Sequence, residues 1–290
     1  MQRFFIIGNP RSGTTLFRLM LNKHSKMIVP PEAGFLVWLY KDIKDENFNK
    51  GYRKFIELLR DTSKIETWNM SYEDLHDYLN IKKPSTFKDI MNCIYVFYAS
   101  HVLKKDVILY GDKNNYYLKH IDLLAELYNE AKFIHIIRDG RSVAASYKGV
   151  MQQQIKSKYA PNLPTDINSI AEEWNTNIRN IEESFNKLKS DRIITIRYED
   201  LVLDPKQELT KICDFLGLEF EEDMLYYYTT TTKDGLEPEE YLDWKKKNLQ
   251  PLQKDEVDKY KQLTNKELIG FEKEAESFLR KYNYINYNKN

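Results

Sequence analysis

A short glycine-rich segment, Gly8–Thr15, carries residue types that bind anions. It follows the apolar run Phe4–Ile7, and an amphipathic stretch with Leu16, Leu19 and Met20 on one side begins directly after it. In the order strand, loop and helix, backbone N–H groups and the helix N-terminus can point at one anion. The spacing matches G-x-x-x-x-G, the pattern of phosphate-binding loops.

This loop departs from the triphosphate-binding pattern at one position. Thr14 stands where that pattern has Lys, while Thr15 keeps the hydroxyl. The missing lysine would reach the β- and γ-phosphates, so its loss argues against a triphosphate. The cation is instead Arg11, whose planar guanidinium suits a tetrahedral, oxygen-rich group. Arg11, Ser12, Gly13, Thr14 and Thr15 are therefore candidate anion-binding residues, and the alternative is a glycine-rich turn without a ligand.

A second polar group follows the apolar run Phe133–Ile137. Arg138 comes directly after this run, and Ser146 lies eight residues further on, about two turns into an expected helix. Ligands of parallel sheets bind beyond the carboxyl ends of the strands. A guanidinium and a hydroxyl at this end can converge on one phosphate monoester. The alternative is a local ion pair between Arg138 and Asp139.

Two more charged side chains follow expected strands. Glu32 comes after Met27–Val29, and Lys113 comes after Val107–Tyr110. Both positions are at the carboxyl end of a strand, where parallel sheets bind their ligands. Asp112 is a candidate to orient Lys113. The alternatives are that Glu32 caps a helix starting near Ala33 and that Lys113 is an ordinary solvated lysine.

Five apolar runs rich in β-branched or aromatic residues predict strands. They are Phe4–Ile7, Met27–Val29, Val107–Tyr110, Phe133–Ile137 and Ile193–Tyr198. Helical patterns separate most of them, such as the apolar stripe formed by Leu209, Ile212, Cys213 and Leu216. The alternation predicts an α/β fold, a three-layer sandwich in which helices cover both faces of a central, mostly parallel sheet of about five strands.

We expect a single domain over residues 1–290, because one α/β domain can fill this length and no linker, repeat or low-complexity tract interrupts it. Residues 41–105 show helical patterns only, inserted between strands. Together with residues 220–250 they are expected to form cap elements, an acceptor pocket and a lid near the site. The end of the chain, from about Lys254, is charged and helical.

The composition excludes several classes of protein. The 44 basic and 44 acidic residues cancel, so no strong overall attraction to nucleic acid or to an anionic membrane is expected, while a local basic pocket is compatible with this balance. No apolar run approaches the roughly 18 residues of a transmembrane helix. The cysteines, Cys93 and Cys213, indicate neither a disulfide framework nor a metal site. The short first apolar run does not fit a signal peptide, which favours a cytoplasmic location.

In this order, the segments resemble the sulfotransferase superfamily that uses 3′-phosphoadenosine 5′-phosphosulfate (PAPS). Gly8–Thr15 is similar to its 5′-phosphosulfate loop, and Ile137–Ser146 is similar to its 3′-phosphate motif. Ile196–Leu201 is similar to the stretch after its last core strand. The resemblance extends from Phe4 to about Trp244 and predicts a P-loop-like fold with helical cap elements.

The resemblance implies transfer of SO₃ from PAPS, which leaves 3′-phosphoadenosine 5′-phosphate (PAP), without a metal. It assigns Arg11 to the phosphosulfate, Lys113 to the bridging oxygen of the breaking bond and Tyr198 to the adenine. A late Trp–Lys segment with Lys245 is similar to the one that closes over the nucleotide, where a basic side chain meets the 3′-phosphate. The alternatives are a core aromatic for Tyr198 and a solvated lysine for Lys245.

The same resemblance makes Glu32 the expected general base. Members that act on small molecules in the cytosol have a His shortly after their lysine region, but this sequence has Asn115 there. It is closer to the tyrosylprotein and carbohydrate sulfotransferases, in which a Glu in this region is the base. His120 is the alternative base.

The predicted function is therefore in-line sulfuryl transfer to a hydroxyl-bearing acceptor, either a small molecule, a sugar or a biosynthetic intermediate. Aromatic stretches at Phe35–Tyr40, Tyr95–Tyr98 and Tyr226–Tyr228 could line the acceptor pocket or fill ordinary cores. Two other functions stay open. One is a kinase-like phosphotransferase, and the other is a nucleotide-binding module without catalysis.

Overall fold

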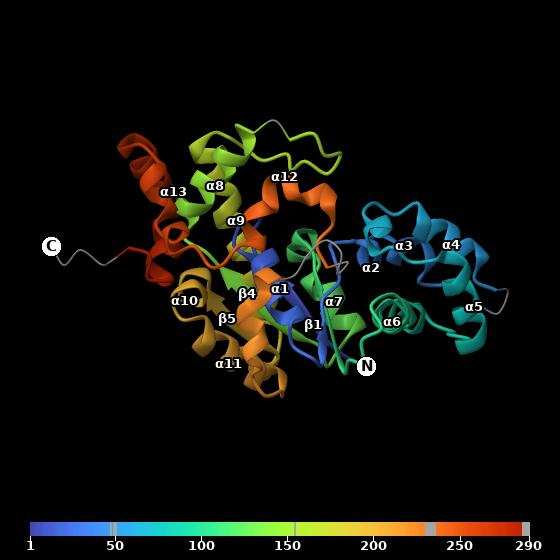
Figure 1. Ribbon diagram of the computed structural model, residues 1–290. Coiled ribbons are helices and arrows are strands. Elements are labelled where there is room, and N and C mark those ends of the chain that lie inside the picture. Colours follow the sequence, from blue (N-terminus) through green and yellow to red (C-terminus); the bar gives the residue numbers. More distant parts are fainter. Residues whose placement is uncertain (47, 49–50, 154, 230–235, 286–290) are drawn as a thin grey trace.

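The structure is a computed structural model that describes residues 1–46, 48, 51–153, 155–229 and 236–285. Its centre is one sheet of five parallel strands in the order β2-β3-β1-β4-β5 (Figure 1). The strands are β1 (Gln2–Ile7), β2 (Met27–Ile28), β3 (Leu109–Lys113), β4 (Lys132–Ile137) and β5 (Ile193–Arg197). Every apolar run predicted as a strand overlaps one of these strands, and the predicted fold class is confirmed.

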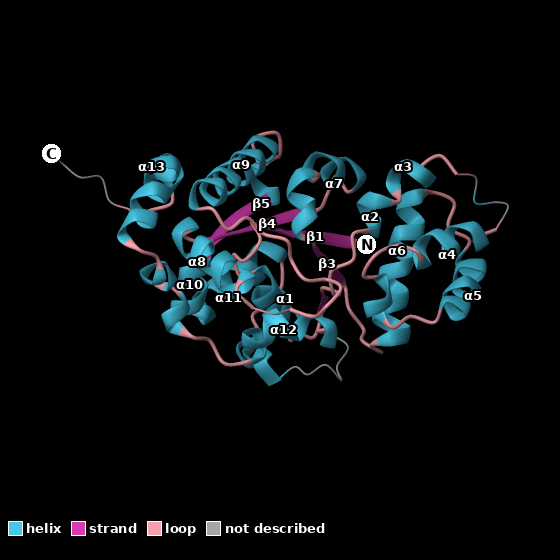
Figure 2. Ribbon diagram, turned by 90° about the horizontal axis from the view of Figure 1, so that it is seen from above, coloured by secondary structure: helices cyan, strands magenta, loops and turns pink. Residues whose placement is uncertain are grey.

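Helices cover both faces of this sheet, which makes three layers (Figure 2). They are α1 (Thr14–Asn22), α2 (Phe35–Trp38), α3 (Tyr40–Ile43), α4 (Arg53–Arg60), α5 (Tyr72–Lys82), α6 (Phe87–Phe97), α7 (Ile121–Leu127), α8 (Gly140–Met151), α9 (Ile167–Phe185), α10 (Tyr198–Leu203), α11 (Pro205–Leu216), α12 (Leu242–Lys245) and α13 (Asn265–Lys281). Helices α7 and α9 pack on one face, and α1 and α11 pack on the other. Short 3₁₀ helices at Lys254–Glu256 and Lys259–Gln262 precede α13.

The side chains of β1 separate the two cores. Phe5 and Ile7 belong to the core under α7 and α9, whereas Phe4 and Ile6 belong to the core under α1 and α11. All four are buried, as expected for a central strand covered on both faces. The predicted stripe of α11 is buried in the second core as well. Apolar patterning alone was therefore sufficient to predict these layers.

The third strand lies further along the chain than predicted. Instead of Val107–Tyr110 it covers Leu109–Lys113, because Gly111, Asp112 and Lys113 pair with β1. A glycine fits at position 111, since a Cβ there would lie 2.3 Å from Cζ of Phe4. Local strand propensity does not favour these three residues, and the tertiary environment overrides it. Lys113 is consequently the last residue of the strand rather than part of the following loop.

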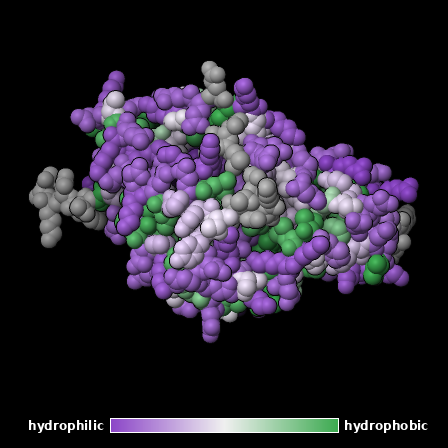
Figure 3. Space-filling model, in the orientation of Figure 1, coloured by the Kyte–Doolittle hydropathy of each residue, from purple (hydrophilic) through white to green (hydrophobic). Residues whose placement is uncertain are grey.

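Helices α4, α5 and α6 form a lobe at one side of the sheet (Figure 1). Of the aromatic residues for which a pocket and a core were both open, Phe35 and Tyr95 fill the core between this lobe and the sheet, together with Trp68, and their ring centroids lie 5.2 to 5.7 Å apart. Tyr227 lines the cavity described below. On the face drawn in Figure 3 the surface is mostly hydrophilic, with apolar side chains gathered beside the lobe. Within the described residues, no helix is long and apolar enough to cross a membrane.

Candidate active site

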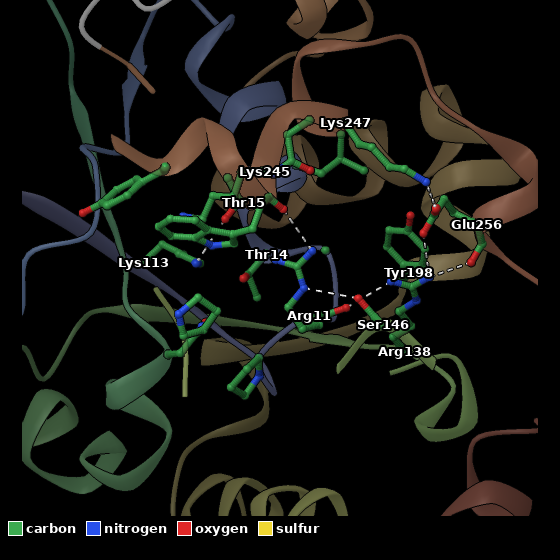
Figure 4. A pocket seen from close by; sticks show the side chains of 18 of the residues that line it. Arg11, Thr14, Thr15, Lys113, Arg138, Ser146, Tyr198, Lys245, Lys247 and Glu256 are labelled. Atoms are coloured by element: carbon green, nitrogen blue, oxygen red, sulfur yellow. Dashed lines mark hydrogen bonds and ion pairs between the residues drawn. The ribbon is translucent and has the colours of Figure 1, made fainter. Parts of the chain in front are cut away.

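All five strands contribute to one cavity of about 430 Å³ at their carboxyl ends. The contributing residues are Arg11 and Gly13–Thr15 after β1, Glu32 after β2, Lys113 at the end of β3, Arg138 after β4 and Tyr198 after β5. Figure 4 shows Lys113 on one side of the cavity and Arg138 on the other, with the loop after β1 between them. Helix α12 and the segment that follows it supply much of the remaining wall, and other segments contribute Lys64, Ser146 and Tyr159.

The loop after β1 has the backbone geometry of an anion site. Gly13 is the N-cap of α1 and has a φ of 88°, in the left-handed region that favours glycine. A Cβ at Gly13 would also lie 2.3 Å from the ring of Tyr198. Ser12 is fully buried, and its Oγ has no hydrogen-bond partner among the described residues. The first turn of α1 carries no acidic residue, so the helix N-terminus is free to attract an anion.

At the Lys113 side, one carboxylate is surrounded by three lysines. Glu32 forms an ion pair with Lys113. Nζ of Lys64 lies 3.3 Å from Oε2 of Glu32, and Nζ of Lys245 lies 3.5 Å from Oε1. Burial acts to raise the pKa of Glu32, but the three lysines hold it well below its usual value. Glu32 is therefore ionised over the whole neutral range.

The side chain and the backbone of Lys113 have different partners. Its Nζ also lies 3.4 Å from Oγ1 of Thr15. Asp112 does not reach this ammonium, because neighbouring side chains of a strand point to opposite faces. Oδ1 of Asp112 accepts the backbone N–H of Lys113 at 2.7 Å, and its other oxygen accepts the hydroxyls of Tyr95 and Tyr117. Burial lowers the pKa of Lys113 to about 8, against the raising effect of Glu32.

At the Arg138 side, cations gather around a different carboxylate. NH2 of Arg138 donates to the backbone oxygen of Glu256 at 2.6 Å and lies 3.4 Å from its Oε2. Nζ of Lys247 lies 2.6 Å from Oε1, and Nζ of Lys259 lies 3.1 Å from Oε2. The Arg138 guanidinium carbon stands 4.4 Å from the centroid of the Tyr198 ring. This cluster of Arg138, Lys247 and Lys259 is called the Arg138 cluster below.

The arginine of the loop after β1 contacts the residues at the Arg138 side. Nε of Arg11 donates to Oγ of Ser146 at 3.3 Å, and NH1 of Arg138 donates to the backbone oxygen of Arg11 at 3.1 Å. Burial and the nearby Arg138 lower the pKa of Arg11. Arg11, Arg138 and Ser146 thus form one connected group.

The structure also decides several alternatives. Helix α2 begins at Phe35 with Gly34 as its N-cap, so Glu32 caps no helix. Asp139 pairs with Arg141 at 2.8 Å and not with Arg138. His120 packs its ring against Tyr116, with centroids 4.4 Å apart, outside the residues that line the cavity.

A family model covers most of this chain. Residues 3–222 match the model of a family described as "Sulfotransferase family". The chain belongs to the sulfotransferase family. The "Protein-tyrosine sulfotransferase" of Drosophila melanogaster is 25% identical over 237 residues, which cover 78% of this chain and 40% of that protein. The "Nodulation protein NoeE" of Sinorhizobium fredii is 27% identical over 168 residues, which cover 58% of this chain and 36% of that protein.

Solved structures share the fold. The sulfotransferase domain of the Synechococcus PCC 7002 olefin synthase superposes with a TM-score of 0.63 at 24% identity, covering 96% of this chain and 95% of that domain. A mouse sulfotransferase solved in complex with PAP superposes with a TM-score of 0.50 at 14% identity, covering 98% of this chain and 85% of that one. The chain thus spans these domains almost fully but less than half of the Drosophila relative.

Within this family member, sequence reasoning missed several residues of the cavity. Lys64 comes from the segment between α4 and α5, and no motif surrounds it. Lys247 follows the expected Trp–Lys segment by two positions and, unlike Lys245, is the lysine at the Arg138 side. Glu256 and Lys259 lie in the charged end of the chain, which resembles an ordinary solvated stretch. Of these residues, only Lys247 lies close enough to a recognised motif, the Trp–Lys segment, to be predicted from the sequence.

Proposed function

We propose that the chain transfers a sulfuryl group from PAPS to the hydroxyl of an acceptor. The arrangement of two anion sites in one cavity carries this proposal: the loop Gly8–Thr15 lies beside Lys113, and the Arg138 cluster lies on the other side. PAPS has a phosphosulfate at its 5′ position and a phosphate at its 3′ position, so it needs two such sites at once.

The donor atoms of the site support this ligand. The buried Oγ of Ser12 and Nε of Arg138 have no hydrogen-bond partner among the described residues, and both can donate to phosphate oxygens. Buried polar atoms without partners are rare, and each indicates a missing ligand or water. The mouse neighbour, whose structure contains PAP, has the same fold. No cluster of three or more His, Cys, Asp or Glu side chains suited to a metal occurs in the described part of the chain.

The transfer forms one S–O bond to the acceptor oxygen and breaks the S–O bond to the nucleotide phosphate. The acceptor proton passes to Glu32, whose carboxylate is ionised and lies in the cavity. The ammonium of Lys113 can donate to the leaving oxygen, because it already lies beside Thr15 of the loop. When Lys113 turns to that oxygen, Glu32 loses one of its three lysines and becomes a stronger base.

The acceptor side of the cavity has aromatic walls. Tyr159, Tyr241 and Trp244 line it beside Lys64, and the rings of Tyr159 and Tyr241 have centroids 5.9 and 5.6 Å from Nζ of Lys64. Such walls bind the flat or apolar part of a small acceptor. We propose a hydroxyl-bearing small molecule, sugar or biosynthetic intermediate. The cytoplasmic location remains a prediction that cell fractionation would test.

Ligand-induced stabilisation tests the donor. PAP should raise the melting temperature of the protein well above the shift produced by ATP with magnesium, because a ligand stabilises the state that it binds. At 100 times its dissociation constant, a single ligand contributes about 2.7 kcal/mol. Differential scanning fluorimetry with PAP, adenosine 5′-phosphate and ATP provides the measurement. Equal shifts for PAP and adenosine 5′-phosphate would refute the assignment of the 3′-phosphate site, and a dominant ATP shift would favour a kinase.

A further inference from the structure

The Arg138 cluster already holds an anion that belongs to the protein itself. The carboxylate of Glu256 receives Lys247 at 2.6 Å, Lys259 at 3.1 Å and Arg138 at 3.4 Å (Figure 4). All of these residues line the cavity. Glu256 therefore occupies the position in which these three cations would bind a ligand.

Glu256 matches this position only in part. One carboxylate brings one negative charge and two oxygens, whereas Arg138, Lys247 and Lys259 bring three positive charges. Nε of Arg138 has no hydrogen-bond partner among the described residues, although the side chain is only 5% exposed. A phosphate monoester brings nearly two charges and three acceptor oxygens at neutral pH. It would satisfy the Arg138 cluster better than the carboxylate does.

The backbone around Glu256 is anchored independently of its side chain. Oγ of Ser142, on α8, donates to the backbone oxygen of Val257 at 3.2 Å and accepts the backbone N–H of Tyr260 at 3.1 Å. Lys259 lies between these two anchor points and so stays beside Arg138 on its own. A rotation of the Glu256 side chain is sufficient to withdraw the carboxylate while the cations remain.

We propose that Glu256 is an internal competitor of the nucleotide 3′-phosphate and thereby determines how tightly this site retains PAP. The inference rests on the proposed function. The 3′-phosphate binds Arg138, Lys247 and Lys259 and displaces the Glu256 carboxylate, which returns to the same cations when the nucleotide leaves. Each binding event therefore breaks three internal ion pairs, so the affinity for PAP is lower than the cluster alone would give. The exchange also favours release of the product.

The Glu256 carboxylate, which is the internal competitor, is ionised at neutral pH. Burial acts to raise the pKa of Glu256, but Lys247, Lys259 and Arg138 lower it to about 2. The competition therefore operates over the whole neutral range. A nucleotide without a 3′-phosphate does not need the Arg138 cluster and leaves Glu256 in place. Adenosine 5′-phosphate, which differs from PAP only by the 3′-phosphate, is the matched probe.

Isothermal titration calorimetry on three proteins tests the proposal: the wild type, Glu256→Gln and the control Glu272→Gln. Glu272 lies on α13, pairs with Arg141 of α8 and is not among the residues that line the cavity. Glu256→Gln should bind PAP about tenfold more tightly, the scale of removing one charged hydrogen-bonded partner. Its affinity for adenosine 5′-phosphate should not change. Glu272→Gln should bind both nucleotides as the wild type does.

A second variant keeps the proposal testable if Glu256→Gln does not fold. Glu256→Asp retains the charge but is shorter by one methylene, so it should bind PAP severalfold more tightly. Unchanged or weaker PAP binding in the variant or variants that fold would overturn the proposal and make Glu256 a structural ion-pair partner. A wild type that binds PAP no better than adenosine 5′-phosphate would instead refute the proposed function, which separates the two failures.

Discussion

Glu32 receives more positive charge than one carboxylate can neutralise. Lys113, Lys245 and Lys64 reach it from three different segments, and Lys245 also lies 3.8 Å from the buried Glu237. Glu237 in turn pairs with the buried Arg18 of α1. The surplus of lysines at Glu32 is what an incoming sulfuryl donor needs, since its oxygens can take over the lysines that Glu32 holds in the free protein.

Removing the charge of Glu32 tests its role as the base. Glu32→Gln should lower turnover by roughly 10²–10⁴, the usual contribution of a general base, while PAP still binds. Steady-state sulfuryl transfer and PAP calorimetry measure the two effects, and a melting curve shows whether the uncompensated lysines destabilise the fold. Glu73→Gln, on the exposed surface of α5, is the control. Near-normal turnover in Glu32→Gln would assign the base to another group.

Lys64 is a positioning residue whose effect should appear in the pH profile. The groups that face Glu32 are Lys64, Lys113, Lys245 and Tyr241. Lys64→Met removes one cause of the lowered pKa of Glu32, so that pKa rises. Activity is lost as pH falls through this pKa, and the acid limb of kcat/KM should therefore move to higher pH. Lys64→Arg should have the same acid limb of kcat/KM as the wild type. If Lys64→Met also had that same acid limb, Lys64 would not control the pKa of Glu32.

At the scale of elements, the turn from β1 into α1 depends on one glycine. Gly13 combines a φ of 88° with the close approach of the Tyr198 ring. Gly13→Ala should destabilise the fold by about 1–3 kcal/mol because it forces a strained backbone and moves that ring. It should also weaken PAP binding. Chemical denaturation and calorimetry measure both changes.

Another glycine provides the matched control for this prediction. Gly149 lies in α8, and a Cβ there would meet nothing within 4 Å. Gly149→Ala should stabilise the protein by about 0.5–1 kcal/mol, because alanine loses less backbone entropy in a helix. If both variants changed stability by the same amount and in the same direction, the special geometry assigned to Gly13 would be wrong.

Element boundaries show where sequence reasoning succeeds and where it does not. Apolar β-branched runs identified every strand, because a central parallel strand is buried on both faces and shows this in its composition. The last residues of β3 were not predicted as strand, because Asp112 and Lys113 are polar. Asp112 is accommodated in the strand by the hydroxyls of Tyr95 and Tyr117, which no local pattern reveals. Polar residues at a strand end therefore need their tertiary partners before they can be assigned.

At the scale of the whole molecule, the predicted part of the site is the part attached to the sheet. Arg11, Glu32, Lys113 and Arg138 follow from the rule that ligands bind at the carboxyl ends of parallel strands. The rest of the wall comes from distant segments. Glu32 and Lys245 are 213 positions apart, and Arg138 and Glu256 are 118 apart. Such contacts depend on long-range packing and leave no local trace.

This distribution has a consequence for how the protein is made. The sheet ends at Arg197, so translation completes the strands and their loop well before Lys245, Lys247 and Lys259 leave the ribosome. A nascent chain at that stage carries the loop Gly8–Thr15 for one end of the proposed nucleotide, and for the other end it carries Arg138 and Ser146 without the two lysines of the Arg138 cluster. If the proposed function is correct, the growing polypeptide therefore becomes able to bind its donor at both ends only after Lys259 has been synthesised.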